Sequence, residues 1–207
     1  LIQLKMENQK SPASKFLEWK SLKTSFVFYD KDKKENIEVK PEFSLIYLYD
    51  FITIKGYHNE LQTGVYSNEV QSFDKDVLEV YAFGRDGSEN TLITKGTYNE
   101  IKDEIKRLGL KFTKSVYGVS GESIINLQLF GSGIGNFFDF YKENKAKLQL
   151  HKIQVAGFTA QKTADGIEFF SPNFVLGDKI TRSEALLVDE LSLQLQSYLT
   201  EKGVLKF

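Results

Sequence analysis

The stretch Phe43-Ser-Leu-Ile-Tyr-Leu-Tyr-Asp-Phe-Ile-Thr-Ile-Lys55 decides the fold class of this chain. It is a long apolar run, too rich in Tyr, Ile and Phe to favour a helix. We predict a central strand over residues 43–55, with a bend. Apolar runs and polar turns predict further strands at residues 26–29, 37–40, 65–70, 77–83, 91–95, 111–119, 123–130, 149–158 and 167–175, with a turn at 84–87.

Three segments change to a helical pattern. Residues 97–108 start with a capping box of Thr97 and Glu100 and end before Gly109. Residues 136–145 form a second helix, and residues 182–199 a leucine-rich amphipathic third. Strands and helices do not alternate regularly, which argues against a doubly wound parallel sheet.

These elements predict a β-rich α+β protein: an elaborated OB-type five-stranded barrel with a mid-chain helix and a C-terminal amphipathic helix. A generic α+β sheet domain is the alternative. We expect residues 1–14 to be a mobile leader, residues 15–176 the barrel domain, and residues 177–207 the C-terminal helix and tail. Met6 is the only methionine, and we interpret it as the natural start of the protein.

The composition is that of an ordinary soluble globular protein, with 41% apolar and 27% charged residues among 207. The chain contains no cysteine, which excludes disulfides, thiolate metal sites and cysteine catalysis. No apolar run approaches the roughly 18 residues that a membrane helix needs. We therefore expect a cytoplasmic protein without a membrane partner.

Charge is unevenly distributed along the chain, although the net charge is only −1. Residues 41–94 and the end of the chain are acidic, whereas three other segments are basic. The basic residues are Lys5, Lys10, Lys15, Lys20, Lys23, Lys31, Lys33, Lys34 and Lys40, then Lys95, Lys102, Lys106, Arg107, Lys111 and Lys114, and finally Lys142, Lys145, Lys147 and Lys152. If these segments meet in the fold, one face of the protein is basic even though the whole is not.

The sequence offers no catalytic or metal-binding pattern. His58 and His151 are far apart, and no serine lies in a Gly-x-Ser-x-Gly elbow. The carboxylate pairs Asp74/Asp76 and Asp189/Glu190 lie in a polar turn or on a helix surface, where nothing separates their pKa values. Residues 131–135, Gly-Ser-Gly-Ile-Gly, indicate a tight strand-to-helix turn, with a phosphate-binding nest as the alternative. We predict a non-enzyme that needs no cofactor.

The remaining signal is the pairing of aromatic rings with lysines and amides, most clearly in Ile54–Val70, which contains Tyr57 and Tyr66. Proteins that bind single strands use a cationic groove for phosphates and ring faces for bases. The motifs of this kind are Trp19-Lys20, Lys55-Gly-Tyr57, Tyr66-Ser-Asn68 and Lys114-Ser-Val-Tyr117. Lys114 and Tyr117 point to opposite faces of a regular strand, which weakens that pair, and any of these rings can instead belong to the core.

Several of these motifs resemble, in their order, single-stranded DNA-binding proteins of bacteriophages. The motifs are Trp19-Lys20, Phe28-Tyr-Asp-Lys31, Ile54-Lys-Gly-Tyr57, Gly64-Val-Tyr-Ser-Asn-Glu-Val70, Lys95-Gly-Thr-Tyr98, Lys111-Phe-Thr-Lys-Ser-Val-Tyr117 and Asn126-Leu-Gln-Leu129. The resemblance covers about residues 15–176. It implies an OB-type fold, sequence-independent binding of single-stranded DNA in replication or recombination, no catalysis, and replication proteins as further partners.

By this resemblance, the DNA-binding residues are Trp19, Lys55, Tyr57, Tyr66, Lys114 and Tyr117; the neighbouring Lys20, Asn68, Lys95 and Lys111 complete the candidate set. The chain departs from many such proteins at its end, where a leucine-rich helix and Lys202-Gly-Val-Leu-Lys-Phe207 replace a disordered acidic tail. We expect this helix to cap the barrel or to form a homo-oligomer contact. The alternative function is a structural or interaction β-domain, such as a virion component or an adaptor, that contacts partners through this helix.

Overall fold

A computed structural model describes residues 10–84 and 88–205 of the chain. The elements in chain order are β1 (Lys15–Lys20), η1 (Ser21–Lys23), β2 (Ser25–Asp30), β3 (Glu35–Val39), β4 (Phe43–His58), β5 (Thr63–Ser67), β6 (Leu78–Ala82), β7 (Thr91–Gly96), α1 (Tyr98–Arg107), β8 (Lys111–Ser120), β9 (Ser123–Phe130), α2 (Ser132–Asn144), η2 (Lys145–Lys147), β10 (His151–Lys162), β11 (Glu168–Lys179) and α3 (Arg182–Glu201). The protein is therefore β-rich with three α-helices, as the sequence predicts. The expected turn at 84–87 falls largely outside the described residues.

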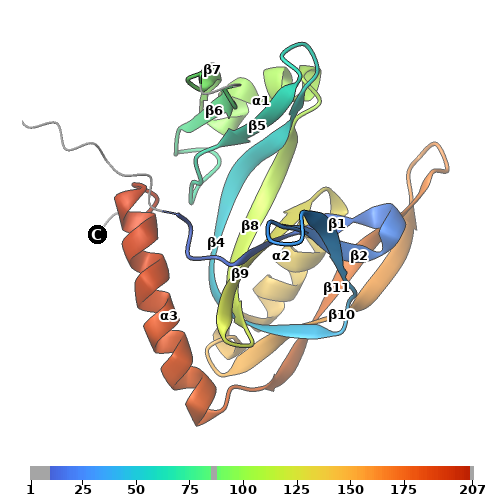
Figure 1. Cartoon of the computed structure of the whole chain (residues 1–207). Coiled ribbons are helices and arrows are strands. Elements are labelled where there is room, and N and C mark those ends of the chain that lie inside the picture. The colour runs from blue at the N-terminus through green and yellow to red at the C-terminus, as the bar shows by residue number, and fades with distance from the viewer. Residues whose placement is uncertain (1–9, 85–87, 206–207) are drawn as a thin grey trace, which may run out of the picture.

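Strand β4 is the long strand that connects the parts of the sheet, because it pairs with three other strands (Figure 1). It pairs with β8 along most of its length, with β5 at its C-terminal end and with β10 at its N-terminal end. Its pairing with β8 shifts register between Tyr47 and Tyr49, and such a bulge bends a strand locally. The predicted long, bent central strand is confirmed, and it extends to His58.

The described strands form one open sheet in the order β3-β2-β1-β9-β8-β4-β5-β6-β7, and the β10–β11 hairpin branches from β4. Strand β1 is parallel to β9, whereas its pairing with β2 is antiparallel. Backbone pairing among these strands does not close the sheet, so the expected five-stranded barrel is not confirmed. The gap between β1 and β11 is bridged by side chains: Trp19 Nε1 donates to the Phe170 carbonyl at 2.8 Å, and the Phe170 amide donates to Ser21 Oγ at 2.7 Å.

Three clusters of buried side chains stabilise the fold. The first lies between the sheet, β11 and α2 and includes Trp19, Phe26 and Phe137. The second packs α1 against β5–β6 through Ile101 and Ile105. The third packs α3 against β4 and β8 through Leu195 and Leu199. Each helix thus buries its apolar stripe against the sheet, which is the dominant favourable contribution to folding.

Helix α1 has the capping box that the sequence predicts, with Glu100 accepting from the Thr97 amide at 2.7 Å. Helix α2 begins at Ser132, four residues before the predicted start, because Gly131 turns the chain with a positive φ of 56°. Gly133 lies beside Pro172, and the glycine-rich segment is the strand-to-helix turn that joins β9 to α2.

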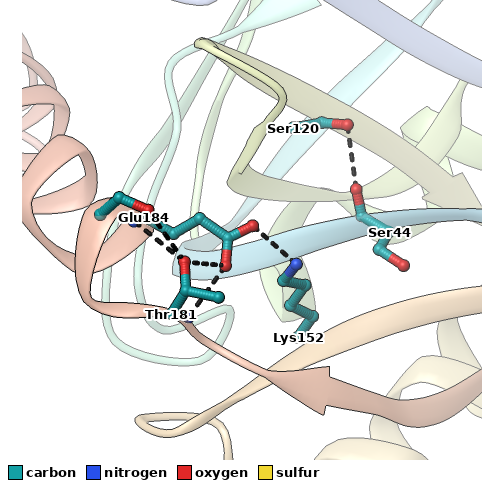
Figure 2. A network of polar contacts seen from close by, with 6 residues as sticks. Ser44, Ser120, Lys152, Thr181 and Glu184 are labelled. Carbon is teal, nitrogen blue, oxygen red and sulfur yellow. Dashed lines mark hydrogen bonds and ion pairs between the residues drawn. The ribbon is translucent and has the colours of Figure 1, made fainter.

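Helix α3 covers one side of the β4–β8 ribbon (Figure 1). Its first turn is capped by Thr181 and Glu184, and the Glu184 carboxylate also pairs with Lys152 Nζ at 2.6 Å (Figure 2). These contacts lower the pKa of Glu184 to about 2. The predicted C-terminal helix is thus present and tied to β10. No helix within the described ranges combines the length and apolar character needed to cross a membrane.

The segment before β1 is more ordered than expected where the structure describes it. Ala13 is buried in the third cluster, and the Ser14 amide donates to the Ile124 carbonyl at 2.8 Å. Residues 1–9 of the predicted mobile leader lie outside the described residues.

Candidate nucleic-acid interface

An open groove with a volume of about 1350 Å³ lies over β1, β2 and the end of β9. In strand β1, Leu17 and Trp19 are buried, so Phe16, Glu18 and Lys20 point to the opposite face, while Lys15, on the side of Leu17, is exposed at the start of the strand. The aromatic residues that line the groove and are not buried are Phe16, Phe28, Tyr29 and Phe130. Phe16 is 40% exposed and Tyr29 is 57% exposed. Large rings at this exposure leave part of their faces available for stacking.

Lysine ammonium groups lie over these rings. Lys111 Nζ is 4.2 Å from the centre of the Phe130 ring, and Lys15 Nζ is 5.2 Å from that of Phe28. Lys55 Nζ lies 5.5 Å from the Phe16 ring centre. Cation–π contacts of this kind contribute roughly 0.5–1 kcal/mol at exposed sites. They place positive charges and aromatic rings side by side on the groove surface.

The groove is more basic than the chain as a whole. Its lining contains the lysines Lys10, Lys15, Lys20, Lys23, Lys31 and Lys111 and the acidic residues Glu18, Asp30 and Asp32. Lys20 pairs with Glu18 at 2.8 Å, and Lys23 pairs with Glu38. Within the described ranges, Lys15, Lys31 and Lys111 make no ion pair, so their charge faces solvent. Lys20 of the first basic segment and Lys111 of the second therefore lie on one face of the sheet, and Lys15 lines the groove from the start of β1, whereas Lys142, Lys145 and Lys147 lie on α2 and η2.

A smaller pocket of about 230 Å³ continues the groove towards β5 and β6. The two share Glu18, Lys111, Gln128 and Phe130. The smaller pocket then reaches Lys55, Gly64 and Phe83. A continuous concave path therefore crosses one face of the sheet from β2 to β6.

Lys55 marks the boundary between this path and the part of the face that α3 covers. Burial lowers the pKa of the Lys55 ammonium, while the carboxylates of Glu69 and Glu18 oppose the shift. Burial raises the pKa of Glu69, whose carboxylate accepts hydrogen bonds from Ser115 Oγ and, at 2.9 Å, from the Tyr117 hydroxyl. A buried polar network therefore lies at the boundary between the path and α3.

Two of the predicted stacking residues are core residues. Trp19 borders the groove but is only 3% exposed, and its indole N–H donates a hydrogen bond to the Phe170 carbonyl. Tyr117 is 2% exposed and packs against Phe51 beneath α3. Neither ring has a free face, so the interpretation of Trp19 and Tyr117 as base platforms is wrong.

Lys114 is also not a groove residue. It pairs with Asp50, and both side chains are mostly shielded from solvent. Asp50 in turn accepts from the Tyr47 hydroxyl at 2.6 Å. Lys114 and Tyr117 lie on opposite faces of β8, as strand alternation predicts, and the Lys114 charge is neutralised by Asp50 rather than presented to a ligand.

The other predicted residues divide between the path and the β5–β7 region. Lys20 and Lys111 line the groove, and Lys55 lines the smaller pocket. Tyr57 is 48% exposed on β4. Asn68 instead clamps β6, since its amide donates to the Val77 carbonyl at 3.0 Å and its oxygen accepts from the Glu79 amide at 2.7 Å.

Lys95 and Tyr66 belong to the same region as Asn68. Lys95 Nζ pairs with Glu79 at 2.6 Å, which neutralises its charge. Tyr66 stacks on Phe83, with ring centres 4.5 Å apart and planes 26° apart. Tyr66 is therefore part of an aromatic stack rather than an isolated platform.

Comparison of the chain with protein-family models, with curated proteins and with solved structures finds no match. Within residues 10–84 and 88–205, no group of three or more His, Cys, Asp or Glu side chains is placed to hold a metal ion.

Sequence reasoning missed Phe16, Tyr29, Phe83 and Phe130, which carry the exposed ring faces of the path. For Phe16, a signal was present: in Phe16-Leu-Glu-Trp-Lys20, residues two apart share a face. If Leu17 and Trp19 are core, Phe16 must be outside. For Phe130 no comparable signal exists, because it reaches the groove only through the pairing of β9 with β1 and β8.

Proposed function

We propose that the protein binds single-stranded DNA without sequence preference and without catalysis, and that it protects the strand during phage-type DNA replication or recombination in the cytoplasm of the host cell. The observation that carries the proposal is the concave path in which Lys55 lies over the Phe16 ring and Lys111 over the Phe130 ring. Such a combination of cations and rings is the common feature of proteins that grip single strands.

Each part of the strand has a suitable partner. The ammonium groups of Lys15, Lys31 and Lys111 neutralise phosphates and release counterions. The bases stack on Phe16, Tyr29 and Phe130, at roughly 1–3 kcal/mol per base. Because every base has a flat face and no base-specific hydrogen bond is needed, this mode does not discriminate between sequences.

The OB-type barrel is part of the same proposal. Strands β1, β9, β8, β4, β10 and β11 follow one another through backbone pairing. The hydrogen bonds of Trp19 and Ser21 with Phe170 bridge the remaining gap between β1 and β11. In the proposed barrel, the groove lies over the outer face of β1 and β9, and OB folds bind oligonucleotides on a strand face.

The test is a fluorescence-anisotropy titration of the full chain with end-labelled oligo-dT of about 30 nucleotides, which exceeds the site of one OB fold. We expect micromolar or tighter binding at low salt that weakens steeply as salt rises. A duplex of the same length should compete poorly, since its bases are not free to stack. A flat titration at low salt would exclude the proposal.

One observation favours a second function. On helix α3, Leu186 is 66% exposed and Leu193 is 67% exposed. The two residues are about two helical turns apart and therefore lie on the same, outer side of the helix. In the alternative function, this side of α3 contacts a protein partner or a second copy of the chain. Such an apolar contact is insensitive to salt, whereas DNA binding is not. Measuring binding at several salt concentrations therefore distinguishes the two functions.

A further inference from the structure

A stack of three aromatic rings lies on β5 and β6, beyond the groove. Tyr66 is in the middle, with the Phe83 ring centre 4.5 Å away and the Tyr81 ring centre 6.0 Å away. The planes of the two pairs differ by only 26° and 30°, so the rings are nearly parallel. We call Tyr66, Tyr81 and Phe83 the aromatic ladder. Phe83, at its end, is 51% exposed.

The ladder is held in place by its neighbours. The Phe83 amide donates to the Gly64 carbonyl at 2.9 Å. Gly64 has no side chain, and a Cβ there would lie only 3.1 Å from the Phe83 ring, so the ring rests directly on strand β5. Asn90 donates to the Tyr66 hydroxyl at 2.7 Å. A ligand that stacks on Phe83 therefore meets a ring that is already ordered, which lowers the entropic cost of binding.

A second exposed ring lies on the same side of the sheet. Tyr57 is the register partner of Gly64 and is 48% exposed. Side chains of paired residues point to the same face, so Tyr57 and Phe83 flank the position where Gly64 has no side chain. Tyr57 and Phe83 therefore present two half-exposed rings on one face of the sheet, next to Gly64.

The ladder is continuous with the groove. Phe83 lines the smaller pocket together with Lys55, Lys111 and Phe130, and the last two also line the groove. A strand that follows the groove past Lys111 therefore reaches Phe83 without leaving the concave surface.

The two ends of the path differ in charge. In the groove, Lys15, Lys31 and Lys111 make no ion pair within the described residues. Beside the ladder, Lys95 is neutralised by Glu79, which also accepts from the Tyr81 hydroxyl at 2.8 Å. The groove is suited to phosphates, whereas the described charged pair beside Tyr81, Glu79 with Lys95, is neutral as a pair.

We propose that Phe83 and Tyr57, at the edge of the aromatic ladder, form a second subsite for the same single strand, one that binds bases by stacking and contributes little phosphate contact. This inference rests on the proposed function. Short oligonucleotides then bind in the groove alone, with a steep salt dependence. Longer ones gain additional affinity from the ladder, and this gain does not change with salt.

The test compares wild type with Phe83→Leu and Phe83→Tyr, using end-labelled oligo-dT from about 5 to about 30 nucleotides, which spans the site sizes of OB folds, at two salt concentrations. Leucine keeps an apolar side chain over Gly64 but removes the ring, whereas tyrosine keeps the ring. We expect Phe83→Leu to match wild type on the shortest oligonucleotides that bind and to lose at least about fivefold in affinity on the longest, the effect of one lost stacking contact. Its salt slope should be unchanged, and Phe83→Tyr should bind like wild type.

If Phe83→Leu matches wild type at every length, or loses the same factor at every length, the ladder is not a separate subsite, and the groove proposal stands. If wild type binds none of the oligonucleotides, the proposed function itself fails. A melting curve checks the fold of each variant. If Phe83→Leu is unfolded, Tyr57→Leu serves instead, since the only hydrogen bond that the Tyr57 side chain makes with the described residues is a 3.3 Å contact with exposed Gln62, and the same length-dependent loss is expected.

Discussion

Lys111 Nζ lies 4.2 Å from the ring centre of Phe130, where the groove over β1 and β2 meets the pocket that leads to Phe83. The two residues begin β8 and end β9. In the antiparallel register, Thr113 pairs with Phe130, which brings Lys111 within reach of the ring. A phosphate contact and a stacking face are thus present together at the centre of the proposed path.

Replacing exposed groove rings should weaken DNA binding without unfolding the protein. The double variant Phe16→Leu/Tyr29→Leu removes two ring faces, and we expect a loss of at least about tenfold in affinity for oligo-dT with an unchanged salt slope. Phe138→Leu is the matched control, because Phe138 is 61% exposed on α2, outside the groove. Equal affinities for the double variant and the control would show that Phe16 and Tyr29 are not base platforms.

The fluorescence of Trp19 should respond to unfolding of the core and not to DNA binding. It is the only tryptophan, so its emission can be followed selectively. Because the indole is buried and hydrogen-bonded to Phe170, we expect a blue-shifted emission that saturating oligo-dT does not quench. Trp19→Phe should lower the free energy of unfolding by roughly 1–3 kcal/mol, since the Phe170 carbonyl loses its donor. Strong quenching in proportion to bound DNA would contradict the core assignment.

Helix α3 should be an integral part of the fold. Leu195 is completely buried against β4 and β8, whereas Leu193, two residues earlier, is 67% exposed. Leu195→Ala should cost about 2–5 kcal/mol in urea denaturation, and Leu193→Ala should stay within about 0.5 kcal/mol of wild type. Similar stabilities for the two variants would mean that α3 does not pack as described.

Glu69 should make the folded state less stable as pH rises, whereas a carboxyl group with a lowered pKa has the opposite effect. Burial raises the pKa of this carboxyl above its ordinary value of 4.5, so the folded state holds a proton that the unfolded state has lost. The contribution of Glu69 to stability is therefore fully present below pH 4.5 and decreases as pH rises through the raised pKa.

The variant Glu69→Gln cannot ionise, and its amide oxygen can still accept from Ser115 or Tyr117. Other acidic groups, such as Glu184, have lowered pKa values and respond to pH in the opposite direction, so the relevant quantity is the difference between the two proteins. We expect wild type to lose stability relative to Glu69→Gln as pH rises from 4.5 to neutral, as measured by urea denaturation. A constant difference over this range would contradict the raised pKa.

The sequence predicts the features of the fold that depend on local signals. The capping box of Thr97 and Glu100 places α1 within a residue at each end, and the run from Phe43 identifies the central strand. The pairing of distant segments could not be predicted in this way. Strand β1 pairs with β9, about 110 residues away, and Trp19 bonds to Phe170 across 151 positions. No local pattern encodes such contacts.

The candidate site was predicted less well, for a physical reason. Lysines beside aromatics drew attention to Lys20, Lys55 and Lys111, which line the path, and to Tyr57, which is half-exposed. An aromatic ring, however, suits the core as well as a binding surface, and the sequence did not reveal which rings α3 and β11 cover. Trp19 and Tyr117 were therefore misassigned, and Phe130, whose position depends on long-range pairing, was missed.

The most direct test of the proposed groove is the salt dependence of DNA binding in two variants of equal charge. Lys15→Gln/Lys31→Gln/Lys111→Gln removes three groove charges, whereas Lys102→Gln/Lys142→Gln/Lys147→Gln removes three exposed charges from α1, α2 and η2. For single strands, each phosphate contact contributes about 0.7 to the slope of log K against log salt. We predict that the groove variant loses about 2 from the magnitude of this slope, and that the control keeps the wild-type slope. Equal slopes in the two variants would contradict the assignment of the groove as the DNA-binding surface.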